Sequence, residues 1–321
     1  MMNQQLPLAV YYEHPEWFRP LFAELDRRSI HYLRIDAGCH AYDANATDRK
    51  YALFFNRMSA SAYLRGNAQG IFFTRDYLAY LERIGTRVIN GYKAFSLEIS
   101  KAAQLALLHS LGLATPRSRI VNCAIQAASA AQEIGFPVII KPNIGGRGAG
   151  IIRFDSAPAL ERPAATDEID FGIDSTALVQ EFLPIRSGHI TRVETLGGKF
   201  LYAIKVYTSG ENFNLCPAEI CRIEDGASPV NTPGLVDAPK TGLKVEGYTP
   251  PQPIIDAVEK IVGAAQIEVG SVEYLIDDRD GRVVYYDINA LSNFVANALQ
   301  ILGFDPHVRL VDYLEQEKER A

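Results

Sequence analysis

The spacing of hydrophobic residues predicts alternating strands and helices in the first 95 residues. Short apolar runs predict strands at 8–12, 31–36, 51–57 and 87–90. Apolar residues at helical spacing predict a helix over 15–29, and a second helix that Thr74 caps and Gly85 ends. Strands that alternate with helices indicate a small open parallel sheet.

The same patterns predict a second and a third unit. The second has helices over 96–112 and 124–135 and strands at 116–121, 136–141, 151–154 and 177–183. The third has strands at 190–196, 200–206, 269–277 and 282–290 and helices near 253–266, 293–302 and 306–319. The stretch 208–251, rich in Gly, Pro, Asn and Asp, indicates a long loop on the substrate side. We therefore expect three domains, 1–95, 96–184 and 185–321.

A glycine-rich stretch, "KPNIGGRGAGIIRF" (141–154), joins two of these predicted strands. A phosphate-binding Walker loop would end in Gly-Lys-Ser/Thr, and a dinucleotide fingerprint would open a helix. Neither context is present here. A glycine hairpin can lie close over a triphosphate, because backbone without Cβ atoms approaches oxygen closely. A bulged hairpin without a ligand is the alternative.

Composition narrows the possible partners. The chain has 321 residues, of which 48% are hydrophobic and 22% charged, and a net charge of −6. It has no basic tract, which argues against nucleic acid as a partner. No apolar run approaches the roughly 18 residues that span a membrane, and the start of the chain lacks the basic region of a signal peptide. We expect a cytoplasmic protein.

The four cysteines are Cys39, Cys123, Cys216 and Cys221. None forms a C-x-x-C pair, which argues against zinc binding. The sequence predicts free thiols that are buried. A catalytic cysteine finds no support at Cys216 or Cys221, because no histidine stands near this pair in the sequence.

Polar residues in otherwise apolar segments form an ordered set. Lys101 precedes Lys141 by about 40 residues, and "VQEFLP" (179–184) follows. "SVEYLIDDRDGRVVYYDINALSN" (271–293) then places Glu273, Asp287 and Asn289 on two consecutive strands. Asp287 and Asn289 are two residues apart and so share a face, which Glu273 can join across the hairpin. Because unpaired polar groups are costly in apolar strands, this pattern favours a functional site.

These motifs, in this order, resemble the ATP-grasp superfamily, over about residues 1–310. Within it the chain is most similar to the ribosomal-protein glutamate ligases and the lysine-biosynthesis ligases, which join a carboxylate to an amine at the expense of ATP. The resemblance implies an N-terminal α/β domain followed by an α+β ATP-grasp fold of two subdomains. It also implies an ADP-forming reaction through an acyl phosphate, and it favours a homo-oligomer.

The resemblance assigns roles residue by residue. Lys101 and Lys141 would hold the ATP phosphates, under the backbone of Gly145, Gly146, Gly148 and Gly150. Adenine would lie against the hinge of Gln180, Glu181, Phe182 and Leu183, bound through main-chain groups and an apolar wall. Mg²⁺ or Mn²⁺ would be bound by Glu273, Asp287 and Asn289. Arg192 would face the phosphate or the acyl intermediate, so that Arg192, Lys141 and Asn289 carry the catalysis. A surface ion pair of Arg192 with Glu194 or Asp170 is the alternative.

Two further positions concern the substrates, expected to be a small-molecule or peptide carboxylate and an amine. Some relatives continue after the metal asparagine with a Pro-Gly turn, whereas this chain has Ala290-Leu291-Ser292-Asn293. Asn293 therefore borders an acceptor pocket that need not take the substrate of those relatives. Arg57, just past a strand end, is placed to hold a carboxylate. An ATP-grasp enzyme with another acceptor, such as a thiol, and a nucleotide-binding module without chemistry are the alternative functions.

Overall fold

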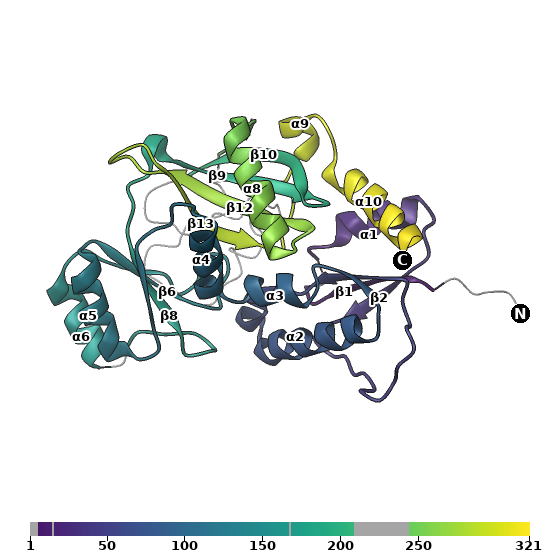
Figure 1. Ribbon diagram of the computed structural model, residues 1–321, viewed down its shortest axis with the longest axis horizontal. Helices are drawn as coiled ribbons and strands as arrows, with labels where there is room; N and C mark the ends of the chain where they lie inside the picture. The colour runs from purple at the N-terminus through teal and green to yellow at the C-terminus, as the bar shows by residue number, and fades with distance from the viewer. Residues whose placement is uncertain (1–5, 15, 167, 209–243) are drawn as a thin grey trace, which may run out of the picture.

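The computed structural model describes residues 6–14, 16–166, 168–208 and 244–321. These residues form one parallel sheet followed by two antiparallel sheets, with helices packed against them (Figure 1). The predicted mixed α/β class, with a parallel sheet at the N-terminus, is confirmed. The division into three domains at residues 95 and 184 stays a prediction.

The first sheet is parallel and has the strand order β2-β1-β3-β4. Its strands are β1 (Leu8–Tyr12), β2 (Tyr32–Asp36), β3 (Leu53–Arg57) and β4 (Arg87–Ile89). Alternate residues face opposite sides. Leu8 and Val10 pack with helices α1 (Arg19–Arg27) and α10 (Pro306–Arg320), whereas Ala9 and Tyr11 pack with α2 (Ala68–Arg83).

The expectation for Thr74 is wrong. Helix α2 begins at Ala68, so Thr74 lies in its interior, fully buried, and its hydroxyl is 3.1 Å from that of Tyr11. A threonine inside a helix can still bond to a neighbouring element, so the residue type alone did not locate the cap.

The second sheet is antiparallel in the order β5-β8-β6-β7. It consists of β5 (Ser118–Val121), β6 (Val138–Pro142), β7 (Ile152–Phe154) and β8 (Ala177–Glu181). Helices α5 (Ala124–Ile134) and α6 (Ala157–Ala165) cover one face (Figure 1). Strands β6 and β7 pair, as predicted, so the glycine-rich stretch is a hairpin loop.

The third sheet is antiparallel in the order β11-β10-β9-β12-β13. It consists of β9 (His189–Leu196), β10 (Lys199–Tyr207), β11 (Val245–Tyr248), β12 (Val269–Ile276) and β13 (Val283–Asn289). Helix α8 (Gln252–Ala265) packs on it, and α9 (Ala298–Leu302) is shorter than predicted. Strand β11 lies inside the predicted loop 208–251, most of which is outside the described residues.

The predicted helix over 96–112 is two helices, α3 (Tyr92–Glu98) and α4 (Lys101–Ser110). Ser100 separates them and caps α4, since its Oγ accepts a hydrogen bond from the Ala103 amide at 3.2 Å. Asn143, just before the glycines, accepts hydrogen bonds from the amides of Lys101 and Ala102. The break therefore places Lys101 in the first turn of α4, beside the hairpin.

Two cysteines differ from expectation. Cys39 and Cys123 are free thiols but exposed, because each lies in a loop or at a helix end rather than in a core strand. Cys216 and Cys221 lie outside the described residues. Among the residues that the structure describes, no helix is both long and apolar enough to cross a bilayer.

Candidate active site

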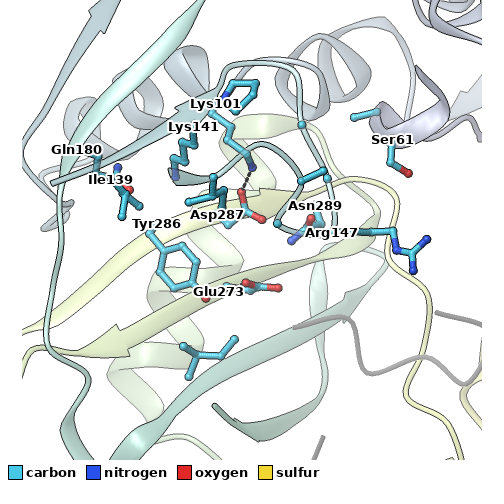
Figure 2. Close-up of a pocket in the computed structure, with 18 of the residues that line it drawn as sticks. Ser61, Lys101, Ile139, Lys141, Arg147, Gln180, Glu273, Tyr286, Asp287 and Asn289 are labelled. Atoms are coloured by element: carbon cyan, nitrogen blue, oxygen red, sulfur yellow. Dashed lines mark hydrogen bonds and ion pairs between the residues drawn. The ribbon is translucent and has the colours of Figure 1, made fainter. Parts of the chain in front are cut away.

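A cavity of about 240 Å³ lies between the three sheets and collects most of the predicted site residues. Figure 2 shows side chains that line it, among them polar ones from α4, β6, β8, β12 and β13 and those of Ser61 and Arg147. The predicted residues that line it are Lys101, Lys141, Gly145, Gly146, Gly148, Gln180, Glu181, Phe182, Leu183, Arg192, Glu273, Asp287, Asn289 and Asn293. Gly150 and Arg57 do not line this cavity.

Strand register brings the acidic side chains together. Glu273 of β12 is directly paired with Asp287 of β13, and Asn289 stands two residues further along β13. The hydroxyl of Tyr286 donates a hydrogen bond to Glu273 at 2.8 Å. Burial, and then the Asp287 carboxylate, raise the pKa of Glu273. Two buried carboxylates side by side are a site that a cation would stabilise.

Lys101 is one cation at this site. Its ammonium group donates to the Asp287 carboxylate, and the two side chains are 16% and 17% exposed (Figure 2). Burial alone would lower the pKa of Lys101, but Asp287 raises it. Burial likewise acts to raise the pKa of Asp287, which Lys101 and Lys141 nevertheless lower. Lys101 is therefore held charged within the cavity.

Lys141 is in the opposite electrostatic situation. The residue is 4% exposed, and burial together with the charge of Lys101 lowers its pKa to about 7. Asp287 and Glu273 only partly offset this effect. Two lysines near one another, of which one is poorly compensated, form a site suited to an anion with several charges.

The glycine hairpin carries an unusual backbone. Arg147, Gly148 and Gly150 have φ values of +59°, +71° and +73°. A Cβ atom on Gly146 would lie 2.9 Å from the Cβ of Ser61 in the 3₁₀ helix η1 (Ala60–Arg65), so the hairpin packs closely against the first unit. A Cβ on Gly150 would meet Pro142 at 2.9 Å. Gly150 thus serves the folding of the hairpin rather than the wall of the cavity.

Gly148→Val should reduce turnover strongly, because a β-branched residue resists the positive φ and would hold the hairpin away from bound phosphates. Gly112→Val is the matched control. Gly112 has a similar φ of +73° and nothing within 4 Å of an added Cβ. Both variants should lose some thermal stability, whereas only Gly148→Val should lose turnover at saturating substrate. Equal turnover in the two variants would contradict a role for the hairpin.

Two backbone amides of the hinge, residues 180–183, are hydrogen-bonded within the protein. The amides of Glu181 and Phe182 donate to the carbonyls of Arg117 and Pro137. The buried Glu181 carboxylate accepts from the Arg117 amide at 2.8 Å and from Arg279 at 3.3 Å. These groups fix the hinge backbone. Phe182 and Leu183 supply the apolar wall of the cavity here.

Arg192 is buried, unlike the surface ion pair considered from the sequence. Its guanidinium group donates to Glu194 at 2.7 Å and to the Ser292 hydroxyl at 2.5 Å, and lies 3.5 Å from Glu273. Burial opposes the charge, but Glu194 and Glu273 raise the pKa of Arg192. The guanidinium therefore stays positive beside the acidic pair.

Sequence reasoning missed Glu98 and Ser292. The Glu98 carboxylate lines the cavity and accepts hydrogen bonds from the amides of Ala290 and Leu291 at 2.6 and 3.2 Å. Burial raises the pKa of Glu98 to about 7. Its polar character in a helix was visible, but its partners are some 190 residues away, so no local pattern marks it.

The oxygen atoms of Glu273, Asp287 and Asn289 fit a hard divalent cation. Among the described residues no cluster of three His, Cys, Asp or Glu side chains could hold a metal, so these two carboxylates need a further ligand. The amide of Asn289 is close, and its Nδ2 is buried without a partner there. Mg²⁺ commonly takes one or two carboxylates and completes its shell with phosphate oxygens and water.

Comparisons with known proteins find chains of similar sequence. Residues 100–185 match the family "Carbamoyl-phosphate synthase L chain, ATP binding domain". A carbamoyl phosphate synthase large chain of Thermotoga sp. (strain RQ2) is 29% identical over 222 residues, which are 65% of this chain and 18% of that protein. A probable alpha-L-glutamate ligase of Teredinibacter turnerae is 28% identical over 208 residues, 62% of this chain and 64% of that protein. The chain thus spans less than two thirds of either relative.

Solved structures match over nearly the whole chain. The D-cycloserine synthetase DcsG has a TM-score of 0.67 at 16% identity, covering 97% of this chain and 99% of that one. The ATP-grasp ligase PsnB, complexed with a minimal precursor, has a TM-score of 0.65 at 18% identity and the same coverage. The D-alanine–D-alanine ligase of Bacillus anthracis, complexed with ATP, has 0.65 at 14%, covering 99% and 98%. The fold of this chain is therefore the fold of these structures, the ATP-grasp fold.

Proposed function

We propose that this protein is an ATP- and Mg²⁺-dependent carboxylate–amine ligase that works through an acyl phosphate and releases ADP and phosphate. One observation carries the proposal: two lysines, an acidic pair with an amide, and a glycine hairpin surround a single cavity. This set matches the needs of phosphoryl transfer, which are positioning and neutralisation of charge. Mn²⁺ would substitute for Mg²⁺ at the same oxygen ligands.

The residues divide the work by charge. Lys101 and Lys141 bind the phosphates of ATP, and the amides of the hairpin cover them. A carboxylate oxygen of the first substrate attacks the γ-phosphorus, and ADP leaves. The amine then attacks the acyl carbon, phosphate leaves, and the amine gives up a proton. Mg²⁺ held by Glu273, Asp287 and Asn289 would neutralise charge that develops on the phosphoryl oxygens.

Arg192 suits the second step. It lies within the cavity wall, is positive, and neighbours Glu273. A fixed cation there stabilises the oxyanion that forms when the amine attacks, at no cost of reorganisation. The relatives support the ligase class in general terms, since they include enzymes named glutamate ligase and D-alanine–D-alanine ligase.

The test is a screen for ADP release against pools of amino acids and dipeptides, with hydroxylamine as a substitute amine. An activated carboxylate should react with hydroxylamine to give a hydroxamate, together with ADP. Release of AMP and pyrophosphate would show adenylation and overturn the mechanism. Absence of nucleotide turnover with every carboxylate would favour a binding module. Release of ADP without formation of a hydroxamate would favour an enzyme with another kind of acceptor.

A further inference from the structure

A second cavity, of about 490 Å³, adjoins the first. Its walls come from the start of α1, from 292–299 and from the start of α10. Trp17 and Asn293 line both cavities, so the two share a wall. The walls are largely apolar, with Phe18, Phe294 and Leu310 among them.

Arg57, which does not reach the first cavity, lines this one. It is 4% exposed, and its Nη2 donates to the Ser292 carbonyl at 2.5 Å. Its Nε and Nη1 are buried, and within the described parts of the chain neither has a partner. The indole Nε1 of Trp17 is likewise buried and unpaired there. Buried donors without acceptors are costly, and here all of them are donors, which is the complement of an anion.

The environment keeps Arg57 charged. Burial lowers its pKa to about 10, with Glu98 and Glu194 acting in the opposite direction, so it is protonated at neutral pH. Its Cζ lies 5.3 Å from the ring centroid of Phe18 and 5.1 Å from that of Phe55. These rings hold the guanidinium plane in place. Neither Glu98 nor Glu194 is bonded to it; they accept from other groups.

Ser292 separates the two arginines. Arg192 donates to its hydroxyl from the first cavity, and Arg57 donates to its carbonyl from the second. A carboxylate bound at Arg57 is therefore on the other side of this residue from the acidic pair and the lysines. It is not the carboxylate that receives the phosphoryl group.

We propose that Arg57 binds a second, non-reacting carboxylate, carried by one of the two substrates, whose apolar body occupies the second cavity. That this ligand is a substrate rests on the function proposed above. Binding of a carboxylate at Arg57 does not depend on that function. A carboxylate oxygen of the ligand accepts a hydrogen bond from one of the two unpaired donors of Arg57, Nε or Nη1. Phe294 and Leu310 contact the body of the ligand. The reacting end extends past Asn293 into the first cavity.

Trp17 is the single tryptophan of the chain and reports on this cavity by its fluorescence. The probes are N-acetyl-L-leucine and its carboxamide, N-acetyl-L-leucinamide, which differ in the carboxylate alone. In wild type the acid should bind more tightly than the amide by roughly 10- to 150-fold, as expected for charged hydrogen bonds. Arg57→Met should remove this preference. Arg57→Lys should keep part of it, because lysine retains the positive charge but lacks the several donors of the planar guanidinium group.

Arg19→Met is the matched control. Arg19 lines the same cavity but is exposed, and it is paired with Glu16 at 2.5 Å. This variant should keep the preference for the acid. Equal binding of acid and amide in wild type, or equal losses in Arg57→Met and Arg19→Met, would overturn the proposal. If Arg57→Met does not fold, Arg57→Lys, which preserves the buried charge, decides the question.

Turnover then identifies which substrate carries the carboxylate. Each substrate found in the ADP screen is compared with its form in which the non-reacting carboxylate is an amide. For either the carboxylate substrate or the amine substrate, wild type should show a higher kcat/KM with the acid than with the amide form. Arg57→Met should lose this difference. If Arg57→Met keeps the wild-type preference for the acid form with both substrates, Arg57 has no role in substrate binding. Failure of ligase function would leave the fluorescence result to stand alone.

Discussion

Replacing Lys141 with methionine should weaken ATP binding roughly 10- to 150-fold and should at the same time stabilise the free protein. The loss follows from removing a cation that would face the phosphates. The gain follows because the buried ammonium group of the wild type has a pKa lowered to about 7, mainly by burial. Calorimetric titration with ATP and thermal unfolding without it measure the two effects.

The stabilisation should depend on pH in a defined direction. Lysine has a pKa of 10.5 in the unfolded chain and about 7 at this site, so between these values the unfolded state binds more protons. Wild-type stability therefore rises with pH from 7 to 10.5. The advantage of the variant should be full below pH 7, up to about 5 kcal/mol, and should vanish above 10.5.

ATP binding supplies an independent check on the same group. Phosphates favour the charged lysine, so above pH 7 wild type should take up a proton on binding, and its affinity should fall as pH rises. Lys93→Met, at an exposed position of α3, is the control and should change neither affinity nor stability. An unchanged ATP affinity in Lys141→Met would contradict the phosphate role of Lys141.

Much of the fold follows from local patterns in the sequence. Strands β1, β3, β12 and β13 were predictable because their apolar runs are short and bounded by turns. The pairing of Glu273 with Asp287 was predictable as well, since a hairpin of two consecutive strands leaves few registers. The proposed metal ligands, Glu273, Asp287 and Asn289, could be placed on one face of this hairpin for this reason.

The errors have a common physical cause, which is that distant residues decide them. The break between α3 and α4 depends on Asn143, whose side chain accepts a hydrogen bond from the Ala102 amide across 41 residues of sequence. Strand β11 exists because it pairs with β10, although its own residues indicate a loop. A short stretch of sequence does not include the distant residues that it contacts in the fold, so its pattern does not predict these features.

The second cavity is the clearest case of this kind. Arg57 and Ser292 are 235 positions apart, and only the fold brings them to 2.5 Å. Asn90 likewise joins the first sheet to the third, donating to the carbonyls of Val269 and Ala290. Local reasoning suggested a carboxylate partner for Arg57 but could not show that it faces a different cavity from Arg192.

Glu273→Gln should lower kcat/KM at low Mg²⁺ by at least about 100-fold, since a metal ion contributes several kcal/mol to stabilising transition-state charge. Asn289→Ala should act in the same direction, because it removes another of the three proposed oxygen ligands. Raising the Mg²⁺ concentration should restore part of the activity in both variants. Binding of adenosine, which lacks phosphates, should change little.

The stability of the free protein should increase in Glu273→Gln, although its activity falls. Burial and Asp287 raise the pKa of Glu273, so its ionised form destabilises the fold above the unfolded pKa of 4.5. Glu273→Gln should therefore raise the melting temperature at neutral pH and have no such effect below pH 4.5. The residual contact with Arg192, at 3.5 Å, offsets only part of the repulsion.

Glu246→Gln is the control for both measurements. Glu246 also accepts from a tyrosine hydroxyl, that of Tyr207 at 2.7 Å, but it is exposed and lines neither of the two cavities. It should change neither the Mg²⁺ requirement nor stability by a comparable amount. Wild-type turnover at low Mg²⁺ in both Glu273→Gln and Asn289→Ala would place the metal elsewhere. The combination of higher stability with lost activity is the result that only a functional acidic pair produces, because a structural pair would lose both together.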